Sequence, residues 1–216
     1  MPFSMMTGRN VKKNLKITAA LIFFNFILIF NCVRDGIRLG YPAFRFEENQ
    51  VVTFLSALLL GLTGWSSLIN YRLLHSSQTG RKFWLFSFFG FLYLCLDEYF
   101  MAHEGIDDLV ASLFRRETTH LEMDGITIAG FGLLALLVCW FFRKEIFRDR
   151  SFLFFLAVGG ICLAGTIFFD LFKQLGVWGI VVEESFKIVG VSSFFSGYSL
   201  ALFSTITQVC FLKAKP

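Results

Sequence analysis

The stretch FLFFLAVGGICLAGTIFFDLF, residues 152–172, contains a single charged side chain, Asp170, among its 21 residues. The hydrocarbon core of a membrane is about 30 Å thick, and a helix crosses it with about 20 apolar residues. A water-soluble protein could not expose so long a run of hydrocarbon at its surface. The stretch therefore has the length and composition of a transmembrane helix.

Six stretches of the chain meet the same requirement: residues 17–33, 51–70, 83–103, 125–142, 152–172 and 185–211. Hydrophobic residues make up 56% of the chain, whereas soluble domains are about 45–50% apolar. The first stretch follows basic residues but lacks the small-residue cleavage site of a signal peptide, so we expect it to remain as a helix. No linker is long enough to separate domains. The sequence predicts one all-α domain over residues 1–216, a polytopic membrane protein with six transmembrane helices.

The basic residues predict the orientation of these helices. With both termini in the cytoplasm, 13 of the 20 Lys and Arg residues lie on the cytoplasmic side, as the positive-inside rule requires. We therefore expect a multi-pass protein of the plasma or inner membrane, with cytoplasmic N- and C-termini. The basic residues occur in short clusters between apolar stretches and form no basic face interleaved with aromatic residues, so nucleic acid is not an expected partner.

The acidic residues gather on the other side, where 14 of the 16 Asp and Glu residues are expected. Three groups lie at outer helix ends: LDEYFMAHEGIDD at 96–108, Asp170, and VEESFK at 182–187. An ionisable side chain at membrane depth costs about 2.5–3.5 kcal/mol and usually faces the interior of a helix bundle. Carboxylates that converge there repel one another unless a proton, a cation or a metal ion compensates their charge. The sequence therefore predicts an outward-facing site between the third, fifth and sixth spans.

The candidate catalytic residues are Asp97, Glu98, His103, Glu104, Glu183 and Glu184. The candidate metal ligands are Asp97, His103, Glu104, Asp170, Glu183 and Glu184. A site rich in carboxylates with few imidazoles suits Ca²⁺, Mg²⁺, Mn²⁺ or Fe²⁺, so a divalent metal ion is the cofactor considered. The alternative is a set of solvated helix ends, with Glu183 and Glu184 in the first turn of a helix, where the macrodipole favours acids.

Lys187 follows Glu183 by four residues and Glu184 by three, and both spacings favour an ion pair on one helix face. Gly159, Gly160 and Gly165 of the fifth span are small enough to allow a close approach between helices.

The motifs LDEYFMAHE and EESFKIVG resemble those of a group of uncharacterised bacterial multi-pass proteins, which carry LDExxxxHE and EExxExxG in the same order. The resemblance covers the chain from the third span onward. It implies a shared site at Asp97, Glu98, His103, Glu104, Asp170, Glu183 and Glu184, and it implies no particular reaction. Lys187 stands where that pattern has a third acid, so part of the positive charge that a metal would supply comes from the chain itself.

Three functions fit these observations. The first is a membrane-embedded enzyme, metal-dependent in one version, that acts on a lipid or other amphiphile through acid–base chemistry. The second is a proton- or cation-coupled carrier. The third is a non-catalytic membrane subunit or sensor whose acidic outer face binds a divalent cation or a partner. The inner halves of the third, fifth and sixth spans are mostly apolar. This favours a cavity that is open only to the outside and argues against a path through the membrane.

Overall fold

A computed structural model describes residues 8–47, 50–74, 80–100, 106, 120–171 and 176–213 of the 216. Within these ranges it describes the backbone alone at 8–15, 17–18, 22, 120–129, 170–171 and 211–213. The described part of the chain is helical and contains no strand, which confirms the all-α prediction.

The helices are α1 (Gly8–Arg38), α2 (Val51–Leu73), α3 (Arg81–Phe100), α5 (His120–Phe141), α6 (Arg143–Ile146), α7 (Arg150–Leu171) and α8 (Gly176–Lys213). Five of them are long and apolar enough to cross a membrane, namely α1, α2, α3, α7 and α8. In α5 the apolar segment within the described side chains is Gly130–Phe141. The chain thus has the architecture of a multi-pass membrane protein.

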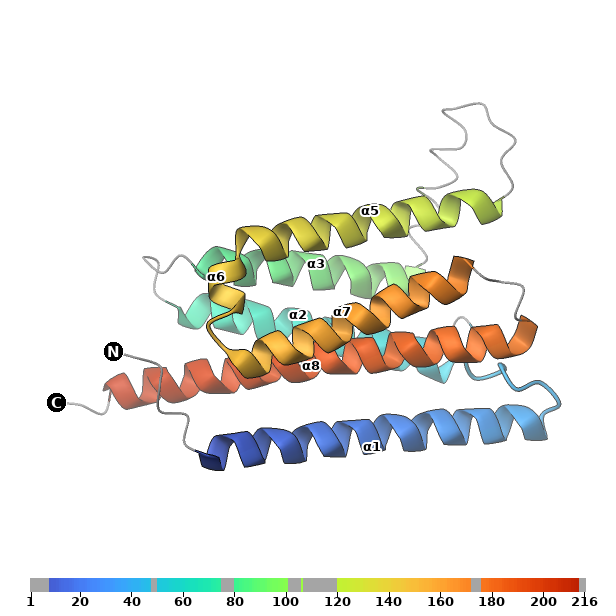
Figure 1. The fold of residues 1–216 in the computed structure, drawn as a ribbon, viewed down its shortest axis with the longest axis horizontal. Coiled ribbons are helices and arrows are strands. Elements are labelled where there is room, and N and C mark those ends of the chain that lie inside the picture. Colours follow the sequence, from blue (N-terminus) through green and yellow to red (C-terminus); the bar gives the residue numbers. More distant parts are fainter. Residues whose placement is uncertain are drawn as a thin grey trace.

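The central helix of the bundle is α8, which packs most extensively on α7 and next on α2, with α1 alongside. The second helix, α2, also packs on α3, and α5 contacts α7. In Figure 1, α1 and α5 form the two outer edges of the bundle, and the beginning of α1 lies at the same end as the end of α8. We call this end the basic end. The opposite end, where α3 and α7 end and α8 begins, is the acidic end.

The helix α2 fits between its neighbours because its buried face carries small polar residues. Ser56, Thr63, Ser67 and Asn70 are fully buried along it. The hydroxyl of Ser67 donates to the carbonyl oxygen of Thr63, four residues earlier, so it does not need a partner on another helix. Small residues of this kind let membrane helices approach closely, and α2 can therefore hold α3 and α8 on its two sides.

The loop between α1 and α2, described at residues 39–47 and 50, covers the bundle at the acidic end. Its residues Ala43 and Phe46 are buried against Val181 and Ile188 of α8. The guanidinium of Arg45 pairs with the carboxylate of Asp35 at 3.1 Å, which fastens the loop to the last turns of α1.

The predicted glycine contacts are confirmed at two positions and wrong at one. A Cβ atom on Gly159 would lie 2.5 Å from the ring of Phe194, and one on Gly165 would lie 2.8 Å from the ring of Phe186. Both rings belong to α8, so these glycines allow the close packing of α7 on α8. Gly160 faces open space, because it lies one residue and about 100° further around the helix.

The boundaries of the last span differ from the prediction. We expected a helix over 185–211, whereas α8 begins at Gly176, which has a φ of 60°. The apolar residues VWGIVV that follow Gly176 extend the helix by about two turns. Glu183 and Glu184 are therefore inside α8, and the interpretation of these acids as first-turn residues is wrong.

Candidate functional site

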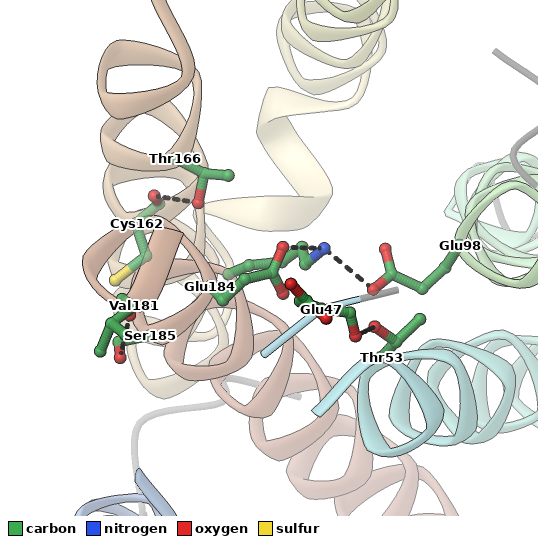
Figure 2. A network of polar contacts seen from close by, with 9 residues as sticks. Glu47, Thr53, Glu98, Cys162, Thr166, Val181, Glu184 and Ser185 are labelled. Carbon is green, nitrogen blue, oxygen red and sulfur yellow. Dashed lines mark hydrogen bonds and ion pairs between the residues drawn. The ribbon is translucent and has the colours of Figure 1, made fainter. Parts of the chain in front are cut away.

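Three charged side chains from two helices meet at the acidic end. The ammonium of Lys187 lies 2.6 Å from a carboxylate oxygen of Glu184, one turn earlier on α8. It also lies 3.1 Å from a carboxylate oxygen of Glu98, on α3. In Figure 2, Glu184 and Glu98 point toward one another, and dashed lines join them through this ammonium. We call Glu98, Glu184 and Lys187 the charged triad.

Helical geometry lets only one of the two neighbouring acids of α3 make this contact, and in the structure it is Glu98. Asp97 and Glu98 are about 100° apart on α3, so only one of them can point at Lys187. The pair at i,i+3 between Glu184 and Lys187 confirms the spacing argument made from the sequence. Asp97 and Glu183 are the half-buried neighbours of the two triad carboxylates.

The triad is largely withdrawn from solvent. The side chains of Lys187, Glu98 and Glu184 are 22%, 14% and 11% exposed. Glu184 lies on the same face of α8 as Val181 and Ile188, which pack beneath the loop that contains Phe46. The loop therefore covers one side of the triad, and the side chain of Lys187 keeps about one-fifth of its surface exposed.

The charge of the triad does not balance. One ammonium faces two carboxylates, so the three groups together carry one negative charge when all are ionised. Binding one proton makes the triad neutral. One carboxylate can then carry a proton while the other stays ionised, which is the arrangement that general acid–base chemistry needs.

A second polar contact joins the same two helices nearer the basic end. The hydroxyls of Ser87 on α3 and Tyr198 on α8 are 2.9 Å apart and buried. Tyr198 lies 11 residues after Lys187, and Ser87 lies 11 residues before Glu98, so each helix presents both of its residues on one face. The rings of Phe91 and Phe194 meet between the two contacts, with centroids 5.6 Å apart. We call Ser87 and Tyr198 the neutral bridge.

Aromatic side chains surround the neutral bridge. The ring of Tyr198 lies 4.9 Å from that of Phe91, 5.5 Å from that of Trp84 and 5.1 Å from that of Phe152, measured between centroids. All of these residues are buried. Below the triad, therefore, the space between α3 and α8 is filled by packed rings. Neither Ser87 nor Tyr198 is among the site residues predicted from the sequence, although the step of 11 residues from Lys187 to Tyr198 places both on one helix face.

The structure places the predicted site residues in three groups. It brings Glu98 and Glu184 together, with Lys187 between them. It positions Asp97 and Glu183 beside them on α3 and α8. The backbone of Asp170 lies in the last turn of α7, whereas its side chain, His103 and Glu104 lie outside the described residues. The convergence of all six metal candidates stays a prediction.

Among the described side chains, no group of three or more His, Cys, Asp or Glu residues is arranged to hold a metal ion. The ammonium of Lys187 lies at the point where Glu98 and Glu184 converge. For these two carboxylates the compensating cation is part of the chain.

A family model described as "Domain of unknown function (DUF8692)" matches residues 15–202. The chain belongs to this family. The matched region runs from α1 to α8 and includes the charged triad and the neutral bridge. Neither a curated protein nor a solved structure matches the chain significantly.

Proposed function

We propose that the chain is a membrane-embedded enzyme that acts on a lipid or other amphiphile at the outer leaflet, with Glu98 and Glu184 as its acid–base pair. The observation that carries this proposal is the ammonium of Lys187 held between two carboxylates from different helices. Maintaining three charged groups inside an apolar bundle is costly, and intramembrane ionisable residues commonly have a functional role for that reason.

In this proposal Lys187 positions the two carboxylates and keeps their combined charge at a single negative unit. One carboxylate removes a proton from water or from a substrate hydroxyl, and the other donates a proton to the leaving group. The apolar part of the substrate lies among the lipids, and its polar part enters the acidic end.

The aromatic packing around Tyr198 favours an enzyme that works from one side of the membrane. A carrier needs polar groups on both sides of its binding site, whereas the α3–α8 space beneath the triad contains the rings of Phe91 and Phe194. The carrier and the non-catalytic subunit are therefore the less favoured alternatives. We do not include a divalent metal ion at Glu98 and Glu184, because the ammonium of Lys187 already lies where these carboxylates converge.

The proposal includes six membrane spans, both termini in the cytoplasm and residence in the plasma membrane. The common location of the beginning of α1 and the end of α8 supports an even number of crossings. Epitope tags at the two ends of the chain test this topology. Both tags should be protected from antibody in intact cells from which the wall is removed, and both should be accessible in inverted vesicles.

The enzymatic proposal is tested with purified protein in sealed vesicles made from the total lipid extract of the expressing cells. Mass spectrometry before and after incubation should show one lipid or amphiphile class consumed and its product formed. Glu98→Gln and Glu184→Gln should abolish this conversion. Glu145→Gln, which removes a carboxylate at the basic end, is the matched control and should retain it.

Two results would overturn the proposal. One is the absence of any conversion by the wild-type protein in these vesicles. The other is a proton flux across the vesicle membrane, followed with an entrapped pH dye, that Glu184→Gln abolishes while the lipid composition stays constant. The second result would establish the carrier in place of the enzyme.

A further inference from the structure

The connection between α5 and α7 forms a sharp elbow at the basic end, residues 140–150, with the short helix α6 at its centre. It connects the apolar segment Gly130–Phe141 of α5 to the apolar segment Arg150–Phe169 of α7. If these helices lie in a membrane, the elbow lies at its surface. The location depends on the membrane architecture of the chain and not on the proposed enzymatic function.

The elbow exposes large apolar side chains next to cations. Trp140, Phe141 and Phe147 are 67%, 83% and 65% exposed. The guanidinium of Arg143 stacks on the ring of Trp140 at 4.7 Å from its centroid and donates to the carbonyl oxygen of Trp140. Tryptophan with a stacked cation is suited to the boundary between acyl chains and headgroups, where one part of the pair is apolar and the other is wet.

The two acids of the elbow are engaged in contacts within the protein. Glu145 accepts a hydrogen bond from Arg148 at 3.2 Å. Asp149 caps α7, because its carboxylate accepts from the backbone N–H groups of Ser151 and Phe152 at 2.8 and 3.2 Å. The positive charges of Lys144 and Arg150 are exposed, so the outer face of the elbow has a net positive charge.

We infer that this elbow is a binding surface for anionic phospholipid headgroups. Lys144, Arg150 and the Trp140-stacked Arg143 would contact the lipid phosphate, and Trp140, Phe141 and Phe147 would lie against its acyl chains. Basic residues next to a membrane attract anionic lipids by about 1 kcal/mol each, and the aromatic side chains keep the cations at the depth of the headgroups.

Lipid retention tests the inference. Full-length protein is reconstituted into equimolar phosphatidylcholine and phosphatidylglycerol, extracted in polymer-bounded discs, and purified, and the lipids in the discs are quantified. The wild-type protein should enrich phosphatidylglycerol over the bulk ratio. The double variant Lys144→Gln/Arg150→Gln should lose enrichment by about fivefold for each cation removed, and the single variant Lys144→Gln should lose about half of that effect on a logarithmic scale.

The matched control is Arg72→Gln/Lys82→Gln. It removes two exposed cations at the same end of the bundle, from the end of α2 and the beginning of α3. This control should retain the enrichment. A bulk lipid ratio around the wild-type protein would overturn the inference, and so would an equal loss in both double variants, which would reflect only the general positive charge of this end.

A second arm distinguishes a lipid headgroup from free phosphate. Inorganic phosphate and chloride at equal ionic strength should reduce the enrichment equally, since screening acts on both. A specific displacement by inorganic phosphate would identify a soluble-phosphate site and would overturn the lipid assignment.

Discussion

The charged triad and the neutral bridge join the same two helices, and they differ in charge and in accessibility. Glu98 and Ser87 are three turns apart on α3, as are Lys187 and Tyr198 on α8. The neutral bridge is fully enclosed by aromatic rings, whereas the side chain of Lys187 is about one-fifth exposed. A contact that serves only to join two helices can be neutral and closed. The triad is charged and partly exposed, and we assign function to it for these two reasons.

The largest expected effect comes from Lys187→Met, which leaves Glu98 and Glu184 without a compensating cation. Removing one partner of a buried ion pair typically costs about 3–5 kcal/mol of stability. Thermal unfolding of the detergent-solubilised protein should show a loss of this size. The triple variant Glu98→Gln/Lys187→Met/Glu184→Gln removes all three charges and should recover most of the loss.

The control for this experiment is Arg148→Met, which removes an exposed cation paired with Glu145 at 3.2 Å. Exposed ion pairs contribute about 0–1 kcal/mol, so the effect should be small. Equal destabilisation by Arg148→Met and Lys187→Met would mean that the triad has no special energetic status.

Gly159→Ala should have the next largest effect. It should disturb the aromatic packing beside the neutral bridge and not the charged triad. The new Cβ atom would lie 2.5 Å from the ring of Phe194, which packs on Phe91 between the two polar contacts. Overpacking of this kind typically costs about 1–3 kcal/mol. Unfolding measurements should show this loss, while the ion pairs of the triad, two turns away on α8, stay intact.

Gly160→Ala is the matched control, because the neighbouring position faces open space. Alanine is favoured over glycine in a helix by up to about 1 kcal/mol, so this variant should be as stable as the wild type or slightly more stable. A loss of stability in Gly160→Ala equal to that in Gly159→Ala would contradict the packing of α7 on α8.

Tyr198→Phe should have a smaller effect, since it removes one hydrogen bond and keeps the ring. A typical buried hydrogen bond contributes about 0.5–1.5 kcal/mol. The cost should be at the low end, because the freed hydroxyl of Ser87 can donate to the carbonyl oxygen four residues earlier, as Ser67 does. Unfolding of Tyr198→Phe, Ser87→Ala and the double variant measures the coupling, and a loss as large as that of Lys187→Met would remove the distinction between the two contacts.

The sequence predicted the helices better than it predicted their ends. Long apolar runs located the helices, because a membrane helix must be apolar over its whole length; in the described residues, five of these helices are long and apolar enough to span a membrane. The beginning of α8 was placed nine residues too late, since VWGIVV fits a loop or a helix by composition alone. That error placed Glu184 at a helix terminus, where an acid needs no partner, and concealed its position inside the bundle.

The candidate site was predicted in part for a related reason. The spacing of Glu184 and Lys187 is local, so helical geometry alone predicts their pair. The choice of Glu98 over Asp97 depends on how α3, which packs on α2, is rotated about its axis. The partnership of Ser87 and Tyr198 has the same origin, and one sequence gives no direct signal for it.

The smallest effect concerns the loop that covers the acidic end. The hydroxyl of Tyr41 donates to the carboxylate of Glu47, and this hydrogen bond raises the pKa of Tyr41 above its ordinary value of 10.0. Because the folded state favours the protonated phenol, the bond stabilises the loop at all pH values below the ordinary pKa. Its contribution is lost as the pH rises through the raised pKa. Ultraviolet titration of tyrosinate should therefore show a late-ionising component in the wild type that disappears in Tyr41→Phe. In Glu47→Gln the same residue should ionise near the ordinary pKa, since a neutral amide does not disfavour the phenolate as a carboxylate does. If the component that Tyr41→Phe removes stays late in Glu47→Gln, burial and not the carboxylate holds the proton of Tyr41. The ionisation of Tyr41 should leave the neutral bridge unaffected. A change in the ultraviolet signal of Tyr198 at the same pH would show that the loop and the aromatic packing are coupled.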